Sequence, residues 1–93
     1  MDRRELVAAA ARGSDLTQRQ MGQALDALLD AIGEALIDGE AVVISSVGRF
    51  EVREYPGRRL RRFDGPGHYT VADRRVPVFK SSAALRRRLR GQA

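Results

Sequence analysis

Hydrophobic and polar residues follow the period of a helix through the first part of the chain. Apolar residues recur at steps of three and four in residues 2–12 and again in residues 21–36, which is the spacing of amphipathic helices. Asp2 and Thr17 each stand three places before a Glu or Gln, as in a capping box, and Gly39 supplies a stop signal. The pattern predicts a short first helix and a second helix of about twenty residues that starts at Thr17.

Strand patterns follow the second helix. Residues 41–44 are β-branched and short, residues 47–48 read as a turn, and residues 50–53 alternate apolar with polar side chains, which together predict a β-hairpin. Residues 76–79 return as a strand whose proline favours an edge position, and residues 83–90 form a final helix behind a capping serine. The expected order is two helices, three strands and a helix.

The segment between the last two strands, residues 54–75, has few apolar residues and a strong turn signal, Asp-Gly-Pro-Gly, at residues 64–67. It is expected to fold as two limbs about a tip, each reaching about 30 Å. A two-stranded hairpin is marginal in water on its own, so we expect something outside the protein to order it. Both faces of this ribbon carry cations because four arginines alternate across the pleat. They are Arg58, Arg59, Arg61 and Arg62.

Composition indicates one small domain that lacks a full core of its own. The chain has 93 residues, 43% of them hydrophobic, but thirteen of these are Ala and only five are aromatic, so a partner chain is expected to complete the core. No Cys is present, which excludes disulfide scaffolds and thiolate metal sites. No apolar run is long enough to span a bilayer and no secretory stretch follows Met1, so a cytosolic protein is expected. The expected dimer contacts are Met21, Leu25, Leu28, Leu29, Ile32, Leu36, Phe50 and Phe79.

The charge is divided unevenly along the chain. The net charge is +5, but residues 1–48 hold four basic and eight acidic residues, a net charge of −4. Residues 49–93 hold thirteen basic and four acidic residues, a net charge of +9. A polyanionic partner is therefore expected to contact the second half. Guanidinium groups match phosphate geometry, and phosphate contacts need no base-edge reading.

The sequence contains few side chains and motifs that could support catalysis. His68 is the only histidine, there is no Cys, and no glycine-rich phosphate loop opens a helix after a strand. We therefore expect no enzyme activity, no catalytic residue, no metal, no cofactor and no small-molecule substrate. Membrane-surface binding is disfavoured because the basic residues lie on a hairpin without an adjoining bulky apolar face.

The chain resembles the HU/integration host factor family of small bacterial DNA-binding proteins across essentially its whole length. The residues that carry the resemblance are 1–6, 16–17, 38–40, 48–54 and 76–80. The resemblance implies an α+β fold that forms an intertwined homodimer, whose two arms reach around a DNA duplex along its minor groove. A related chain could replace one copy to give a heterodimer. The implied location is the bacterial nucleoid, in the cytoplasm.

On this basis we expect one HU-like domain over the whole chain, with four parts. Residues 1–39 form the helical dimerisation base, and residues 40–53 and 76–80 form a three-stranded antiparallel sheet. Residues 54–75 form the protruding β-ribbon arm, and residues 81–93 form the short C-terminal helix and tail. The family match implies DNA contacts from Arg3, Arg53, Arg58, Arg61, Arg75, Lys80 and Arg86. Charge and location add Arg59, Arg62 and Arg74.

The tip departs from the family pattern. Family members similar to this one carry a proline that inserts between base pairs and kinks the duplex, and Phe63 stands in its place here. Pro66 lies three residues further on. Phenylalanine is itself an accepted wedge residue, so three alternatives remain: a Phe63 wedge, a Pro66 wedge, or a tip that does not intercalate and leaves the DNA straighter.

The sequence thus predicts architectural binding of double-stranded DNA with low sequence specificity, serving compaction or bending. Two other functions would use the same basic arms. A protein-interaction or structural dimer could grip acidic protein surfaces, and its binding would survive moderate salt. A structured-RNA binder would hold an A-form helix by shape, which competition between matched DNA and RNA duplexes would reveal.

Overall fold

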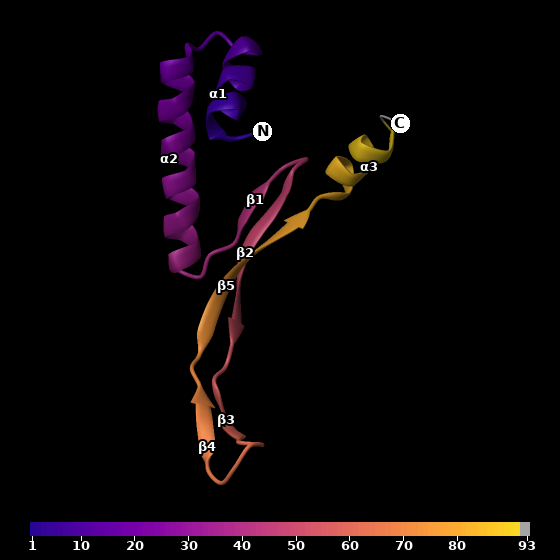
Figure 1. Cartoon of the computed structure of the whole chain (residues 1–93). Helices are drawn as coiled ribbons and strands as arrows, with labels where there is room; N and C mark the ends of the chain where they lie inside the picture. The colour runs from indigo at the N-terminus through magenta and orange to yellow at the C-terminus, as the bar shows by residue number, and fades with distance from the viewer. Residues whose placement is uncertain (92–93) are drawn as a thin grey trace. The chain divides into compact units, whose positions relative to one another are not determined.

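The computed structural model describes residues 1–91, which form an α+β chain (Figure 1). Contacts divide it into two units, Met1–Glu34 and the chain from Ala35 onward, and each is described by itself. The elements in order are α1 (Arg3–Arg12), α2 (Gln18–Ile37), β1 (Val42–Ile44), β2 (Gly48–Tyr55), β3 (Arg58–Arg61), β4 (His68–Val71), β5 (Arg74–Ser81) and α3 (Ala83–Gly91).

Side-chain caps fix where the first two helices begin. At α1 the Asp2 carboxylate accepts a hydrogen bond from the Glu5 N–H at 2.9 Å, and the Glu5 carboxylate accepts one from the Asp2 N–H at 3.3 Å. At α2 the Thr17 hydroxyl accepts from the Gln20 N–H at 3.1 Å, and the Gln20 side chain accepts from the Thr17 N–H at 2.9 Å. Both predicted capping boxes are confirmed, and they satisfy N–H groups that have no partner within the helix.

The end of α2 is set by a glycine. Gly39 has a φ of 79°, a left-handed conformation that an L side chain rarely adopts. Its N–H donates to the Leu36 carbonyl at 3.0 Å, and the Glu40 N–H donates to the Ala35 carbonyl at 2.9 Å. This pair of bonds is a Schellman motif, so the predicted glycine stop is confirmed.

The body of the second unit is a three-stranded antiparallel sheet in the order β1-β2-β5. Pro77 lies on β5, an outer strand, where its missing N–H costs no interior ladder bond. The predicted turn at residues 47–48 is wrong, because the turn occupies residues 45–47, with Ser46 at a φ of 67°, and Gly48 starts β2. Gly48 is needed there, since a Cβ atom would lie 2.4 Å from the Lys80 carbonyl oxygen.

The arm is a second, two-stranded ladder of β3 and β4. The body ladder of β2 and β5 continues to Tyr55 opposite Arg74, two residues further along each limb than the sheet boundaries predicted from the sequence. After β5, the Ser82 hydroxyl accepts a hydrogen bond from the Leu85 N–H at 3.0 Å and caps α3, which confirms a serine cap for the last helix.

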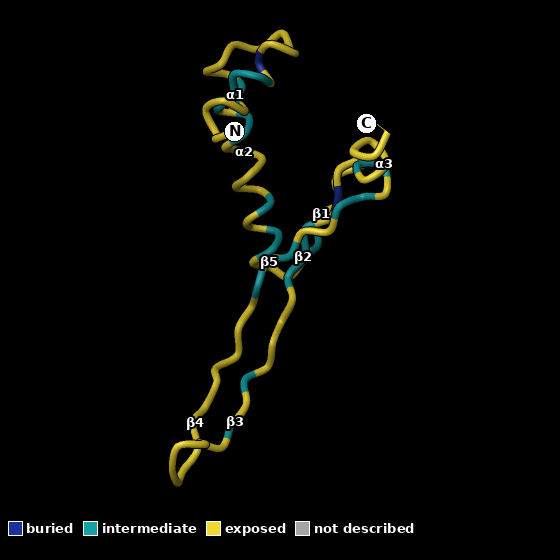
Figure 2. Tube along the Cα trace, turned by 45° about the vertical axis from the view of Figure 1, so that its right-hand side comes forward, coloured by how far each residue is buried: buried dark blue, intermediate teal, exposed yellow. Residues whose placement is uncertain are grey.

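Very little of the described chain is buried (Figure 2). Ala11 is the one buried hydrophobic residue within residues 1–91, whereas Leu28 is 62% exposed, Leu29 49% and Phe79 46%. None of the eight expected dimer contacts is buried in this single chain. No helix within residues 1–91 is long and apolar enough to cross a membrane.

Candidate nucleic-acid interface

The distal ribbon places its arginines on both faces. Arg59 lies opposite Thr70 on one face, and Arg58 lies opposite Val71 on the other, because directly opposed residues of an antiparallel pair share a face. Arg61 shares the first face, opposite His68, and the second face also carries the apolar pair of Leu60 with Tyr69. The predicted distribution of charge over both faces is therefore confirmed, with one face fully polar and the other mixed.

The arm cations are available to an outside partner. Arg58, Arg59, Arg61 and Arg62 are all exposed. No salt bridge within residues 1–91 involves any of the four. Four uncompensated guanidinium groups therefore lie within five consecutive residues. The trace of this arm is largely exposed in Figure 2.

The tip presents a bare aromatic ring. The Arg62 N–H donates to the Gly67 carbonyl at 3.1 Å and closes the loop, and Gly67 has a φ of 105°, which favours glycine. Phe63 is 100% exposed, and Pro66 is exposed as well. An exposed phenylalanine has no partner in this chain and is free to pack against an external apolar surface.

The sheet body holds a second group of cations around one carboxylate. Lys80 lies opposite Arg49 in the β2–β5 ladder. The Lys80 Nζ lies 2.9 Å from Glu51 Oε1, and the Arg49 Nε lies 3.0 Å from Glu51 Oε2. The pKa of the Glu51 carboxyl is lowered, chiefly by its hydrogen bond with Lys80 and next by its hydrogen bond with Arg49. Lys80 is thus already paired when no DNA is present, whereas Arg53 is exposed and pairs with no acid within residues 1–91.

The arginines at the base of the arm make specific contacts. The Arg74 guanidinium carbon lies 4.7 Å from the Tyr55 ring centroid, a cation–π distance. Arg75 forms a salt bridge with Glu54, with 3.5 Å between the Arg75 Nε and the Glu54 Oε1. Its guanidinium also donates, at 3.1 Å each, to the carbonyls of residues 36 and 37 at the end of α2, where helix carbonyls lack intrahelical partners. These two candidates therefore have structural contacts that the sequence did not suggest.

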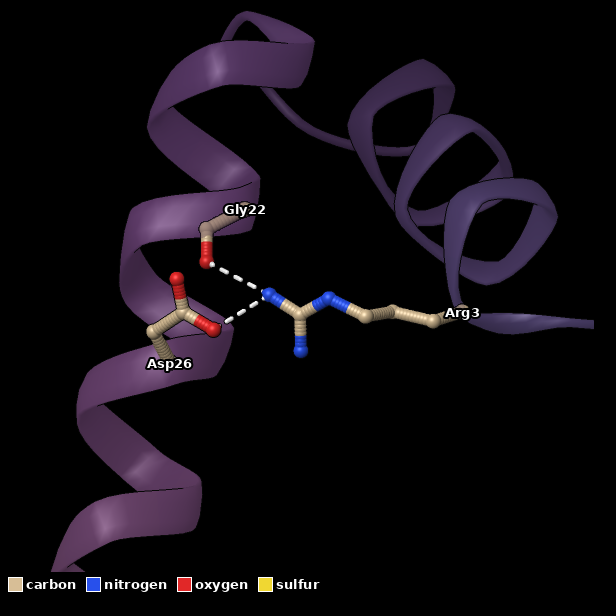
Figure 3. A network of polar contacts seen from close by, with 3 residues as sticks. All are labelled: Arg3, Gly22 and Asp26. Atoms are coloured by element: carbon tan, nitrogen blue, oxygen red, sulfur yellow. Dashed lines mark hydrogen bonds and ion pairs between the residues drawn. The ribbon is translucent and has the colours of Figure 1, made fainter.

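Two other predicted DNA-binding residues, Arg86 and Arg3, also make contacts within the chain. Arg86 donates to the carbonyl and the hydroxyl of Ser81. Arg3 lies in the first unit, where its guanidinium pairs with Asp26 and donates to the Gly22 carbonyl at 3.4 Å (Figure 3). Asp26 is the first of three acidic residues, with Asp30 and Glu34, that lie four positions apart along α2.

Some cations near these groups were overlooked in the sequence. Arg49 became a candidate only through its register with Lys80. In α3, Arg87, Arg88 and Arg90 are exposed, and the described helix Ala83–Gly91 has no acidic residue. The basic run at residues 86–90 is evident in the sequence, so all of its arginines could have been predicted as DNA contacts. Within residues 1–91 no cluster of three His, Cys, Asp or Glu side chains could hold a metal ion.

Comparisons with known proteins agree on one family. The sequence model described as "Bacterial DNA-binding protein" matches residues 1–90. DNA-binding protein HU of Staphylococcus aureus (strain COL) is 35% identical over 86 residues, which covers 92% of this chain and 96% of that protein. DNA-binding protein HU of Geobacillus stearothermophilus is 36% identical over the same length, with the same coverage of both chains.

Solved structures give the same result for the fold. A cocrystal structure of Anabaena HU with DNA has a TM-score of 0.80 at 31% identity and covers 96% of this chain and 97% of that chain. HU from Thermotoga maritima has a TM-score of 0.69 at 28% identity, covering 96% and 98%. The HU-like α+β fold expected from the sequence is confirmed. With its capped helices, its three-stranded sheet and its basic ribbon, this chain belongs to the bacterial DNA-binding protein family.

Proposed function

We propose that this chain binds double-stranded DNA as an architectural protein of low sequence preference. The observation that carries the proposal is the set of four exposed arm arginines that pair with no acid within residues 1–91. A narrow ribbon of this kind fits a DNA groove, and guanidinium groups bind phosphates without reading bases. The cocrystal of Anabaena HU with DNA supports the choice of partner.

The proposed contact surface has two parts. The arm supplies Arg58, Arg59, Arg61 and Arg62, with Phe63 as the wedge between base steps. The body supplies Arg53, Lys80 and Arg86 at the sheet and the start of α3. The base arginines 74 and 75 and Arg3 join the surface where DNA competes successfully for their present contacts.

The functional unit is proposed to be a homodimer. Leu28 and Leu29 of α2 are largely exposed in one chain, and so is Phe79 of β5. Burying such side chains fully contributes about 1.5–3 kcal/mol each, so a second copy that covers them would supply the missing core. Residues 1–39 would then serve dimerisation and residues 54–75 would serve binding. Membership of the bacterial DNA-binding protein family supports a role on DNA. We place that role in the bacterial nucleoid, where the protein would compact or bend DNA without a catalytic step.

A paired-variant salt titration tests this function. Replacing Arg58→Gln together with Arg61→Gln should weaken binding to any duplex sequence and reduce the slope of log affinity against log salt by about 2–4, for up to four lost phosphate contacts per dimer. The control changes Arg12→Gln with Arg19→Gln, two exposed arginines outside the proposed surface that carry the same charge. Equal slopes for the arm variant and wild type would place the DNA elsewhere.

A further inference from the structure

The two ladders that make up the long ribbon are separated by an interruption that keeps their register. Pairing of β2 with β5 ends at Tyr55 opposite Arg74, and pairing of β3 with β4 resumes at Arg58 opposite Val71, after two unpaired residues on each limb. Residues 56–57 on one limb face residues 72–73 on the other (Figure 1). Because neither limb gains a residue, the interruption is a joint between two in-register ribbons and not a bulge.

The residues at the joint explain why the ladder stops. Pro56 has no N–H and cannot donate to the opposite limb. At Gly57 the two limbs approach so closely that a Cβ atom would lie 2.3 Å from the Val71 carbonyl oxygen and 2.8 Å from the Asp73 nitrogen. Backbone pairing is therefore lost while the limbs stay in close contact, and only glycine fits.

One side-chain contact crosses the joint. The Asp73 carboxylate accepts a hydrogen bond from the Gly57 N–H, across sixteen positions of sequence. It supplies an acceptor where the ladder itself is interrupted. We name this contact, between the Asp73 carboxylate and the Gly57 N–H, the clasp.

Two side-chain contacts link the limbs on the side of the joint that adjoins the sheet. Arg74 covers the Tyr55 ring at 4.7 Å, and on the neighbouring rung Arg75 pairs with Glu54 at 3.5 Å. Consecutive rungs point to opposite faces of a ribbon, so the body ladder ends with a cross-strand pair on each face. We therefore expect the arm to bend at the joint, where the clasp is a side-chain contact that links the two limbs.

We propose that Asp73 is a positioning residue for DNA binding, one that holds the distal ribbon and its arginines in place through the clasp. The inference rests on the proposed function. A carboxylate on a DNA-binding arm repels phosphates, so charge alone predicts tighter binding when it is removed. The clasp predicts the opposite for a substitution that removes the acceptor, because a loose ribbon loses more freedom on binding.

Three variants of the full chain separate charge from positioning. Asp73→Asn removes the charge and keeps an acceptor oxygen, whereas Asp73→Ala removes both. Asp64→Ala removes one charge at the exposed tip, where that carboxylate makes no salt bridge within residues 1–91. Each variant is titrated with a mixed-sequence DNA duplex at several salt concentrations. The free proteins are compared by amide exchange at Gly57 and by 15N order parameters of residues 58–61.

The clasp predicts that Asp73→Ala binds DNA about fivefold more weakly than Asp73→Asn, the effect of one net hydrogen bond, with no difference in salt slope because the phosphate contacts are the same. Asp73→Asn and Asp64→Ala should bind at least as tightly as wild type. In the free protein, only Asp73→Ala should speed Gly57 exchange and lower the order parameters of residues 58–61.

Equal affinities for Asp73→Ala and Asp73→Asn, with equal Gly57 exchange, would overturn the proposal. Faster exchange without a difference in affinity would also overturn the positioning role, since the clasp would then not affect binding. A wild-type protein that binds no duplex would instead refute the proposed function, and that result is read directly from the wild-type titration.

Discussion

The Lys80 ammonium lies 2.9 Å from a carboxylate oxygen of Glu51 on the neighbouring strand. The second carboxylate oxygen takes the Arg49 guanidinium at 3.0 Å. One acid thus compensates two cations of the sheet body before any DNA arrives. Phosphates must compete with Glu51 for Lys80, whereas the arm arginines are free of such competition.

Removing this acid should strengthen DNA binding. Glu51→Gln leaves Lys80 and Arg49 uncompensated, and we expect about a two- to fivefold gain in affinity, the range that a partly exposed ion pair allows. The control is Glu40→Gln, which removes an exposed charge that makes no salt bridge within residues 1–91. The same gain from both variants in a fluorescence titration would mean that only net charge matters.

The lowered pKa of Glu51 predicts how the stability of the fold changes at low pH. Because the pKa is depressed in the folded state, chiefly by the Lys80 hydrogen bond and then by that of Arg49, ionised Glu51 stabilises the fold at pH values above its ordinary pKa. That contribution is lost as pH falls through the lowered value. An NMR titration of the Glu51 carboxyl should show Lys80→Gln raising its pKa towards the ordinary range. An unchanged pKa in the variant would show that this contact does not cause the shift.

The dimer can be tested through the exposed apolar residues. The ring centroids of Phe50 and Phe79 lie 5.0 Å apart, yet Phe79 remains 46% exposed and Leu29 49% exposed in one chain. Sedimentation should give a dimer at micromolar concentration, and Tm should rise with protein concentration. Leu29→Asp should lower Tm and shift the protein towards monomer, since an interface cannot easily bury an unpaired charge. A wild-type monomer with a concentration-independent Tm would contradict the dimer.

The tip is tested by measuring the shape of bound DNA. On a short duplex labelled at both ends, wild-type protein should shorten the end-to-end distance, because the fully exposed Phe63 unstacks a base step. Phe63→Ala should restore much of the distance, and Pro66→Ala should not. If only Pro66→Ala restores the end-to-end distance, Pro66 and not Phe63 is the wedge. An unchanged distance with wild-type protein would make this a protein that coats or bridges straight DNA.

Much of the fold was predictable because its signals are local. The capping boxes at Asp2 and Thr17 and the stop at Gly39 each depend on residues within a few positions of one another. The arginine run in residues 58–62 could likewise be assigned to an arm from composition and from the turn that follows it.

The contacts that refine the site depend on residues far apart in sequence. Pro56 and Gly57 read as a generic break, and nothing nearby indicates that Asp73 lies opposite them. The pairing of Lys80 with Glu51 likewise requires the strand register, which a single-residue shift would abolish. Local pattern identifies the elements, whereas register decides which cations are free.

The most direct test of the central claim is a salt titration of wild-type binding to a mixed-sequence DNA duplex, with a matched RNA duplex as competitor. Phosphate binding by the arms predicts tight association at low salt and a steep linear fall of log affinity with log salt. The proposed fit of the arms to a groove of B-form DNA predicts only weak competition by the A-form RNA duplex. Absence of binding at low salt, or an affinity that does not change with salt, would contradict the account.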